Sequence, residues 1–126
     1  MNAKKQEGGL NEWLLPGACT APVDIYAVGF QEIVDLNAAN VLLDGSKTAE
    51  RARFWQARIE EAFASRRLKY QLVMSKALVG LLLCVYVKDS LVPHVSDVRA
   101  THQATGIMGV MGNKGGVCVR LSVFDT

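Results

Sequence analysis

Residues 79–87, Val-Gly-Leu-Leu-Leu-Cys-Val-Tyr-Val, form a nine-residue apolar run. A short apolar run of this kind is typical of a buried strand, and we predict that it is the central strand of a sheet. Residues 70–74 precede it and carry a second strand pattern. Because few residues separate the two runs, we expect antiparallel pairing of the hairpin type.

The clearest helix is predicted upstream of these strands, over residues 48–66. Thr48 is a suitable N-cap, and Arg66 and Arg67 lie where positive charge complements the dipole at the end of a helix. Apolar residues recur at helical spacing in this segment. We expect them to form the face of the helix that packs on the core: Ala52, Trp55, Ile59, Ala62 and Phe63.

Further elements are predicted closer to the N-terminus. Residues 24–30, Asp-Ile-Tyr-Ala-Val-Gly-Phe, are apolar almost throughout, which predicts a strand covered on both faces. Residues 9–15 predict a short helix that Pro16 and Gly17 end. Residues 33–42 predict a short helix or a turn.

Two strands are predicted in the C-terminal part of the chain. Residues 95–101 alternate weakly between apolar and polar side chains, and residues 117–124 alternate cleanly. The order helix, strand, helix and then several strands favours a mixed α/β fold with antiparallel hairpins. A chain of 126 residues has the size of one small domain.

Composition narrows the classes of function. The formal net charge of +2 is too small to indicate nucleic acid as a partner, or membrane binding by charge alone. The start of the chain has no apolar segment typical of a secretory signal, and no apolar run reaches the roughly 18 residues of a membrane span. Cys19, Cys84 and Cys118 show no metal-binding spacing. We therefore expect a cytoplasmic protein whose membrane contact, if any, is peripheral.

Residues 105–116, Thr-Gly-Ile-Met-Gly-Val-Met-Gly-Asn-Lys-Gly-Gly, are unusually rich in glycine. A segment with so much glycine packs poorly on itself, and two hypotheses follow. In one, it is a structural connection between strands. In the other, Asn113 and Lys114 bind an anionic group while the apolar side chains meet a lipid surface: Ile107, Met108, Val110 and Met111.

Glu32 is the best catalytic candidate because it directly follows the predicted strand 24–30. Ligands of open α/β sheets bind at the carboxyl ends of strands, and a carboxylate there suits Mg²⁺, which prefers oxygen ligands and phosphate oxygens. The alternative is an ordinary loop residue or helix cap. His94 and His102 lack partners at a catalytic or metal-binding spacing, and we expect both to be surface or strand residues. Arg120 lies on the polar face of its strand, either in an ion pair or facing a site.

Two long motifs together resemble the inositol polyphosphate 5-phosphatase family. Residues 24–40, Asp-Ile-Tyr-Ala-Val-Gly-Phe-Gln-Glu-Ile-Val-Asp-Leu-Asn-Ala-Ala-Asn, resemble the strand and helix around the family's metal-binding glutamate. Residues 105–120 resemble its glycine-rich segment equally closely, and the similarity runs in order along nearly the whole chain. Two motifs at the right separation are far more specific than either alone.

The resemblance implies the four-layer α/β sandwich of the endonuclease/exonuclease/phosphatase type, here incomplete. It implies Mg²⁺-dependent hydrolysis of the 5-phosphate of a phosphoinositide lipid or a soluble inositol polyphosphate, on the cytosolic face of membranes. Glu32 would be the Mg²⁺ ligand, supported by Gln31. Asn113 and Lys114 would line the substrate side. The family's lipid-facing hydrophobic residues would match Ile107, Met108, Val110 and Met111.

Several motifs of the family are absent from this sequence. It lacks the upstream Trp-Asn-Val-Asn type motif and the downstream Ser-His, Gly-Asp-Phe-Asn and Pro-Ala-Trp-x-Asp-Arg motifs. We therefore expect residues 1–126 to be the N-terminal portion of one catalytic domain, truncated at both ends. Phosphoryl transfer needs several positioned groups together, so essentially no turnover is expected from this chain alone.

Two other functions compete with the truncated phosphatase. One is a catalytically dead lipid-binding or adaptor fragment that uses the glycine-rich segment only for membrane contact. The other is a different superfamily member, such as a nuclease or a sphingomyelinase. The apolar tip of the segment argues against a nuclease, whose substrate favours a more basic surface.

Overall fold

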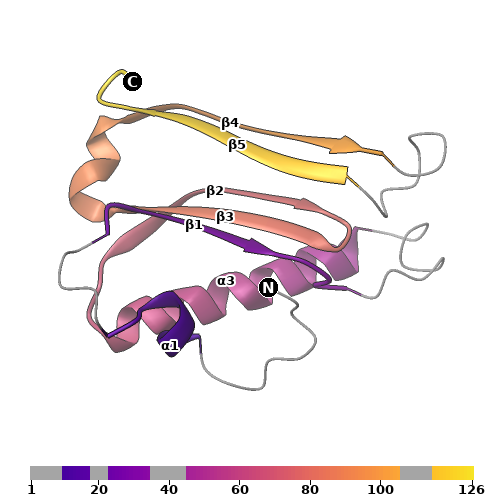
Figure 1. The fold of residues 1–126 in the computed structure, drawn as a ribbon, viewed down its shortest axis with the longest axis horizontal. Coiled ribbons are helices and arrows are strands. Elements are labelled where there is room, and N and C mark those ends of the chain that lie inside the picture. The colour runs from indigo at the N-terminus through magenta and orange to yellow at the C-terminus, as the bar shows by residue number, and fades with distance from the viewer. Residues whose placement is uncertain (1–9, 18–22, 35–44, 106–114) are drawn as a thin grey trace.

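The computed structural model describes residues 10–17, 23–34, 45–105 and 115–126. These residues form three layers (Figure 1). Helices lie below a three-stranded sheet, and a two-stranded sheet lies above it. The predicted mixed α/β class is confirmed, and three layers of the expected four-layer sandwich are present among the described residues.

The middle layer is an antiparallel sheet in the order β1-β3-β2. The predicted central strand is confirmed as β3 (Leu81–Lys88), which pairs with both neighbours. Val79 and Gly80 fall outside this strand, because they form the turn that joins it to β2 (Tyr70–Leu78). The hairpin predicted from the closeness of the two apolar runs is therefore present.

The prediction that the first strand is covered on both faces is wrong. In β1 (Ile25–Phe30), Val28 and Phe30 are buried, whereas Ala27 and Gly29, each of which precedes one of them, are exposed. The strand lies at the edge of its sheet, and the helices cover one face. Its exposed positions hold Ile25, Ala27 and Gly29, which are apolar or small, so composition alone does not reveal the alternation.

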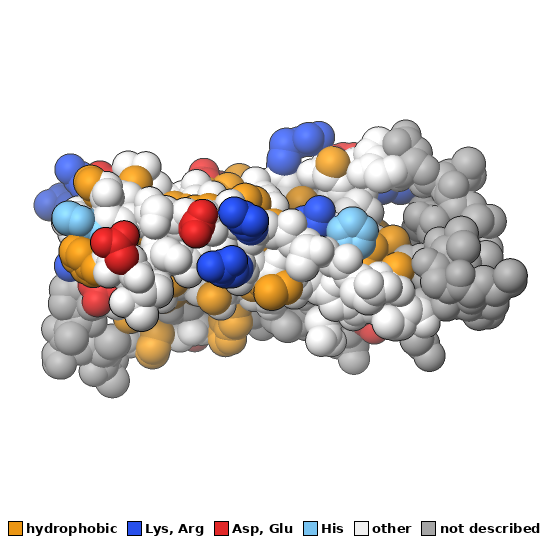
Figure 2. Space-filling model, turned by 90° about the horizontal axis from the view of Figure 1, so that it is seen from above, with side chains coloured by type: hydrophobic (Ala, Val, Ile, Leu, Met, Phe, Trp, Pro, Cys, Tyr) orange, Lys and Arg blue, Asp and Glu red, His pale blue; other side chains and the backbone are white. Residues whose placement is uncertain are grey.

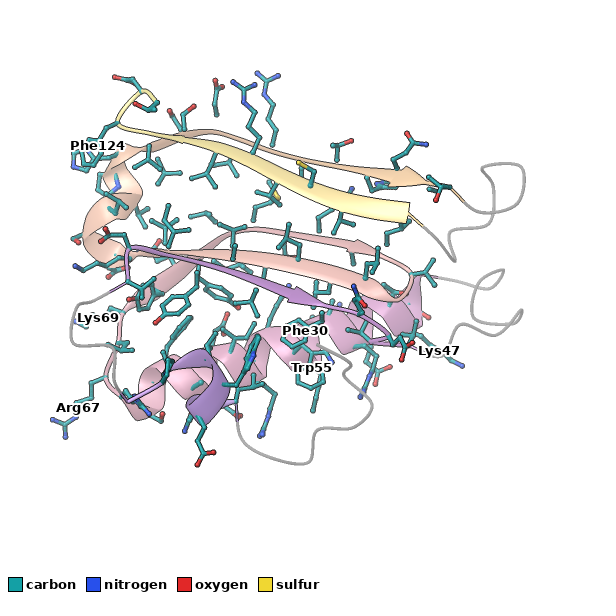
Figure 3. All side chains as sticks on the ribbon, viewed as in Figure 1. Phe30, Lys47, Trp55, Arg67, Lys69 and Phe124 are labelled. Atoms are coloured by element: carbon teal, nitrogen blue, oxygen red, sulfur yellow. The ribbon has the colours of Figure 1, made fainter. Side chains whose placement is uncertain are left out.

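The long helix α3 (Ser46–Ser65) confirms the predicted helix and extends it by two residues at the start. All five residues predicted to face the core are buried, and Ile59 is fully excluded from solvent. Phe30 of β1 stacks on Trp55 of α3 with ring centroids 4.8 Å apart, as Figure 3 shows between strand and helix. The short helix α1 (Asn11–Leu14) adds buried leucines beside them.

The predicted N-cap of this helix is wrong. Gly45 is the N-cap residue and makes no side-chain cap hydrogen bond. Thr48 lies inside the first turn, where its hydroxyl donates a hydrogen bond to the Val79 carbonyl oxygen at 3.2 Å. The hydroxyl thus joins the helix to the β2–β3 turn. The segment 35–44, which holds most of the second predicted short helix or turn, lies outside the described residues.

The upper layer follows the short 3₁₀ helix η2 (Asp89–His94). Its antiparallel strands β4 (Val95–Ala104) and β5 (Gly115–Val123) confirm the two strands predicted in this region. This sheet packs on β2 and β3. The predicted alternation holds in β5, where Val117 and Val119 are half-buried while Cys118 and Arg120 are exposed. None of the described helices is long and apolar enough to cross a membrane.

Candidate metal-binding edge

Glu32 lies just beyond β1, at one edge of the three-stranded sheet. Its side chain is exposed, and Gln31 before it is exposed as well. The backbone of Glu32 has a φ of 56°, in the left-handed region. Such a conformation costs a non-glycine residue on the order of 1–3 kcal/mol and persists where the surroundings hold it. Residues of this kind cluster at functional sites, which adds to the reason for singling out Glu32.

Two hydrogen bonds fix the peptide groups that follow Glu32. The Ile33 amide donates to the Gly80 carbonyl oxygen at 3.1 Å. Arg51 of α3 donates from Nε to the Ile33 carbonyl oxygen, also at 3.1 Å. The Ile33 side chain itself is buried in the core. The backbone next to Glu32 is thus held by both the β2–β3 turn and the long helix.

The β2–β3 turn also holds the start of α3, because the Thr48 hydroxyl donates a hydrogen bond to the Val79 carbonyl oxygen. Val79 has a φ of 44°, which is rare for a β-branched residue. The carboxyl end of β1, the start of α3 and the β2–β3 turn lie together at the right-hand edge of Figure 1. Lys47, labelled at that edge in Figure 3, marks the start of the helix.

The glycine-rich segment connects to this edge. β4 ends at Ala104 and β5 begins at Gly115, and both points lie on the right-hand side of Figure 1. A Cβ atom at Gly115 would overlap the Gln103 carbonyl oxygen and come within 2.8 Å of Leu78 Cδ2. The start of β5 therefore packs closely against the residue that precedes the β2–β3 turn.

The six candidate residues of the glycine-rich segment lie outside the described residues. Their assigned roles stay predictions: Ile107, Met108, Val110, Met111, Asn113 and Lys114. The structure does bring both ends of that segment to the edge that carries Glu32.

The side chains at this edge can supply one carboxylate ligand to Mg²⁺. Glu32 offers an exposed carboxylate and Gln31 an amide oxygen. Within the described part of the chain, no group of three His, Cys, Asp or Glu side chains is arranged to hold a metal ion. Mg²⁺ is usually bound through one or two carboxylates together with waters and substrate phosphates. A single exposed carboxylate therefore suits Mg²⁺ better than it suits a metal ion that needs several protein ligands.

The histidines lie away from this edge. His94 stacks on Phe124 with ring centroids 4.4 Å apart, and Figure 3 places Phe124 at the opposite end of the molecule from Lys47. His102 is an exposed residue of β4. Both observations confirm the prediction that the histidines are surface or strand residues.

The outer face of β4 and β5 carries the remaining charged candidate, Arg120. It is exposed and lies opposite Arg99, which is 3.7 Å from Asp97. Figure 2, which looks down on this sheet, shows charged side chains of both signs scattered among polar ones. Arg120 thus lies on a mixed surface and not at the Glu32 edge.

The described cysteines differ in their surroundings. Cys84 is buried in β3, and burial raises the pKa of its thiol to about 11. A thiol with so high a pKa is a poor nucleophile at neutral pH. Cys118 is exposed on β5. Burial also raises the pKa of Tyr86, which leaves this side chain a neutral part of the core.

Sequence reasoning missed the supporting residues Arg51 and Thr48. The sequence predicts only a capping role for Thr48, and it indicates no role for Arg51. The two residues are three positions apart, so they share one face of the helix. That spacing is the one signal in the sequence for their role, and it does not reveal which part of the sheet this helix face contacts.

Comparison with known proteins matches residues 1–126 to the family described as Endonuclease/Exonuclease/phosphatase family 2. Human synaptojanin-1 is 34% identical over 93% of this chain and 8% of its own length. Type I inositol polyphosphate 5-phosphatase 8 of Arabidopsis thaliana is 33% identical over 93% of this chain and 31% of its own length.

A solved structure shows the same fold. It is the inositol polyphosphate 5-phosphatase domain of SPsynaptojanin in complex with inositol (1,4)-bisphosphate and calcium ion. The match has a TM-score of 0.73 and 34% identity, and covers 93% of this chain and 32% of the other. The chain thus spans less than a third of each of these proteins, which include inositol polyphosphate 5-phosphatases, and it belongs to endonuclease/exonuclease/phosphatase family 2.

Proposed function

We propose that this chain contributes the Glu32 edge of a Mg²⁺-dependent 5-phosphatase that acts on phosphoinositides or soluble inositol polyphosphates. The supporting observation is the convergence of Glu32, the β2–β3 turn and the start of β5 at one edge. The inositol (1,4)-bisphosphate in the solved relative carries no 5-phosphate. A molecule of that kind is what hydrolysis at the 5-position of a trisphosphate leaves behind.

In this proposal, Glu32 is one protein ligand of the metal. The bound Mg²⁺ supplies Lewis-acid stabilisation of charge on the phosphoryl group. Gln31 supports the carboxylate, and the Glu32 side chain is exposed on a left-handed backbone. Asn113 and Lys114 bind the anionic substrate by an amide and a positive charge.

The remaining groups for turnover are not supplied by the described residues. Phosphoryl transfer needs a residue that positions the attacking water as well as charge neutralisation. We expect the isolated chain to have essentially no activity, and we expect a longer polypeptide of this family to supply those groups.

Membrane contact is the second part of the proposal. Four apolar side chains would insert shallowly at the cytosolic face of a membrane and present the lipid headgroup to the site: Ile107, Met108, Val110 and Met111. At about 25 cal/mol per Å² of buried apolar surface, four such side chains contribute several kcal/mol. A catalytically dead lipid-binding adaptor is the alternative, since it would use the same segment without turnover.

A chimera tests the catalytic part of the proposal. The segment of the solved 5-phosphatase domain that matches this chain is replaced by residues 1–126, and phosphate release from inositol 1,4,5-trisphosphate is measured with Mg²⁺. We expect activity from the chimera, and a loss of about 100-fold with Glu32→Gln because a metal ligand is removed.

Two controls make the result decisive. The unmodified solved domain reports full activity, and thermal unfolding of each protein reports whether it is folded. A folded chimera without activity, or a Glu32→Gln chimera as active as its parent, would contradict the proposal. For the membrane part, Met108→Ser with Met111→Ser should reduce activity on phosphoinositide liposomes more than on the soluble substrate.

A further inference from the structure

We propose that Arg51 and Thr48 are positioning residues for Glu32, and that the β2–β3 turn is the element through which they act. This inference rests on the proposed function, because it assigns the support of the same carboxylate. Neither residue belongs to the motifs that indicated the site. The inference follows from contacts among the described residues alone.

Arg51 acts on the backbone that follows Glu32. Its Nε–H donates to the Ile33 carbonyl oxygen at 3.1 Å, while its guanidinium lies 5.1 Å from the centre of the Phe54 ring. Contacts on two sides limit the rotation of the guanidinium plane. A lysine would keep the positive charge but not the planar group that makes both contacts. The Ile33 carbonyl is therefore held by a donor in a fixed orientation.

The Ile33 amide is held by a second hydrogen bond. It donates to the Gly80 carbonyl oxygen in the β2–β3 turn at 3.1 Å. Glu32 precedes Ile33 directly and has left-handed backbone. Because both polar groups of Ile33 are bonded, the preceding residue cannot relax to an extended conformation without breaking at least one of the two hydrogen bonds. The two bonds thereby fix where the Glu32 side chain leaves the backbone.

Thr48 acts one step further away. Its hydroxyl donates to the Val79 carbonyl oxygen at 3.2 Å, so it ties the start of α3 to the turn that accepts the Ile33 amide. Arg51 thus joins α3 to the Glu32 segment, and Thr48 joins α3 to the turn that holds that segment. We expect Thr48 to have the smaller effect, because it does not contact the segment itself.

The residue that precedes this turn also lies against the start of β5. Leu78, at the end of β2, lies so close to Gly115 that even a methyl group there would not fit without movement. The turn therefore bonds to the segment of Glu32, and Leu78 directly before the turn lies against the first residue of β5. Its position fixes the carboxylate and the end of the β4–β5 sheet relative to each other.

The test compares variants of the 126-residue chain by two measurements that need no turnover. Hydrogen exchange of the Ile33 amide reports the support of the Glu32 segment, and a titration with Mg²⁺ followed by NMR reports metal affinity. We expect Arg51→Ala to speed Ile33 exchange and to weaken Mg²⁺ binding about 10-fold, as is typical when a partner behind a metal ligand is lost. Thr48→Val, which keeps the side-chain shape, should weaken binding less, and Thr48→Ser should restore it.

Arg58→Ala is the matched control, since Arg58 lies on the same helix in an exposed pair with Glu61. It should change neither measurement, and exchange of the β3 amides should stay slow in every variant. The positioning role is overturned if Arg51→Ala and Thr48→Val leave Mg²⁺ affinity unchanged while Glu32→Gln lowers it. It is also overturned if β3 exchange rises as much as Ile33 exchange, because the effect is then general unfolding. If Glu32→Gln leaves affinity unchanged, the metal assignment of the proposed function fails instead.

Discussion

The two sheets of this protein are built differently. The three-stranded sheet is covered by α3 and α1 on one face, and its central strand includes Cys84, Tyr86 and Val87, all fully buried. The β4–β5 sheet contributes no buried residue, since its inner positions are half-buried and its outer positions are mostly exposed. One sheet thus contains the core, and the other rests on it.

This difference explains which part of the candidate site is held in place by the core. Glu32 extends from the well-packed sheet, and the segments that hold it, the β2–β3 turn and α3, belong to the same body. The glycine-rich segment joins the two strands of the less buried sheet. The carboxylate is therefore placed by the core, whereas the two ends of the glycine-rich segment are placed by β4 and β5.

The largest expected effect on stability comes from a cavity in the core. Ile59→Ala removes most of a side chain that has no exposed surface, and a substitution of this kind costs about 2–5 kcal/mol. The matched change in the other sheet, Val119→Ala, removes a half-buried side chain and should cost about 1 kcal/mol, because less apolar surface is lost. Urea denaturation measures both, and equal losses would show that the two sheets are packed alike.

Alkaline pH should act on the same core. Burial raises the pKa of Cys84 from 9.0 to about 11, so above pH 9 the unfolded chain loses the thiol proton before the folded chain does. The folded state is then disfavoured, and stability falls as pH rises from 9 to 11. Because one pKa unit corresponds to 1.36 kcal/mol, the loss reaches about 2–3 kcal/mol.

Two variants separate this thiol from other groups. The raised pKa of Tyr86 adds a further loss above its ordinary value of 10, so the range from pH 9 to 10 isolates Cys84. Urea denaturation at several pH values should show a shallower decline in Cys84→Ala. Cys118→Ala should decline like the parent chain, because that thiol is exposed. A parent chain whose stability stays level up to pH 11 would contradict the buried-thiol assignment.

The elements that sequence predicted best are those with a strong apolar period. The stripe from Ala52 to Phe63 and the run that became β3 are set by local pattern, and both are confirmed. The family was confirmed as well, because its two motifs are long and in order. Patterns of this kind need no knowledge of what packs against them.

The parts that sequence did not predict depend on contacts between distant residues. Whether β1 is central or at an edge is decided by strand pairing, which its own apolar composition does not record. Thr48 has the chemistry of a cap, and only the position of Val79, 31 residues away, shows its actual acceptor. Arg51 likewise gains its role from Ile33, 18 residues earlier. The candidate carboxylate was predictable, whereas its support was not.

A comparison of two neighbouring glycines tests how β5 packs on the core. Gly115→Ala places a methyl group against the Gln103 carbonyl oxygen and Leu78, and because backbone cannot yield as a side chain can, the start of β5 must shift at about 1–3 kcal/mol. Gly116→Ala is the matched control, since a Cβ there meets nothing within 4 Å, and less backbone freedom in the unfolded state makes it neutral or slightly stabilising. Thermal unfolding should separate the two variants. Equal melting temperatures would mean that Gly115 has room to move, and that its close approach to Leu78 and Gln103 does not hold the strand.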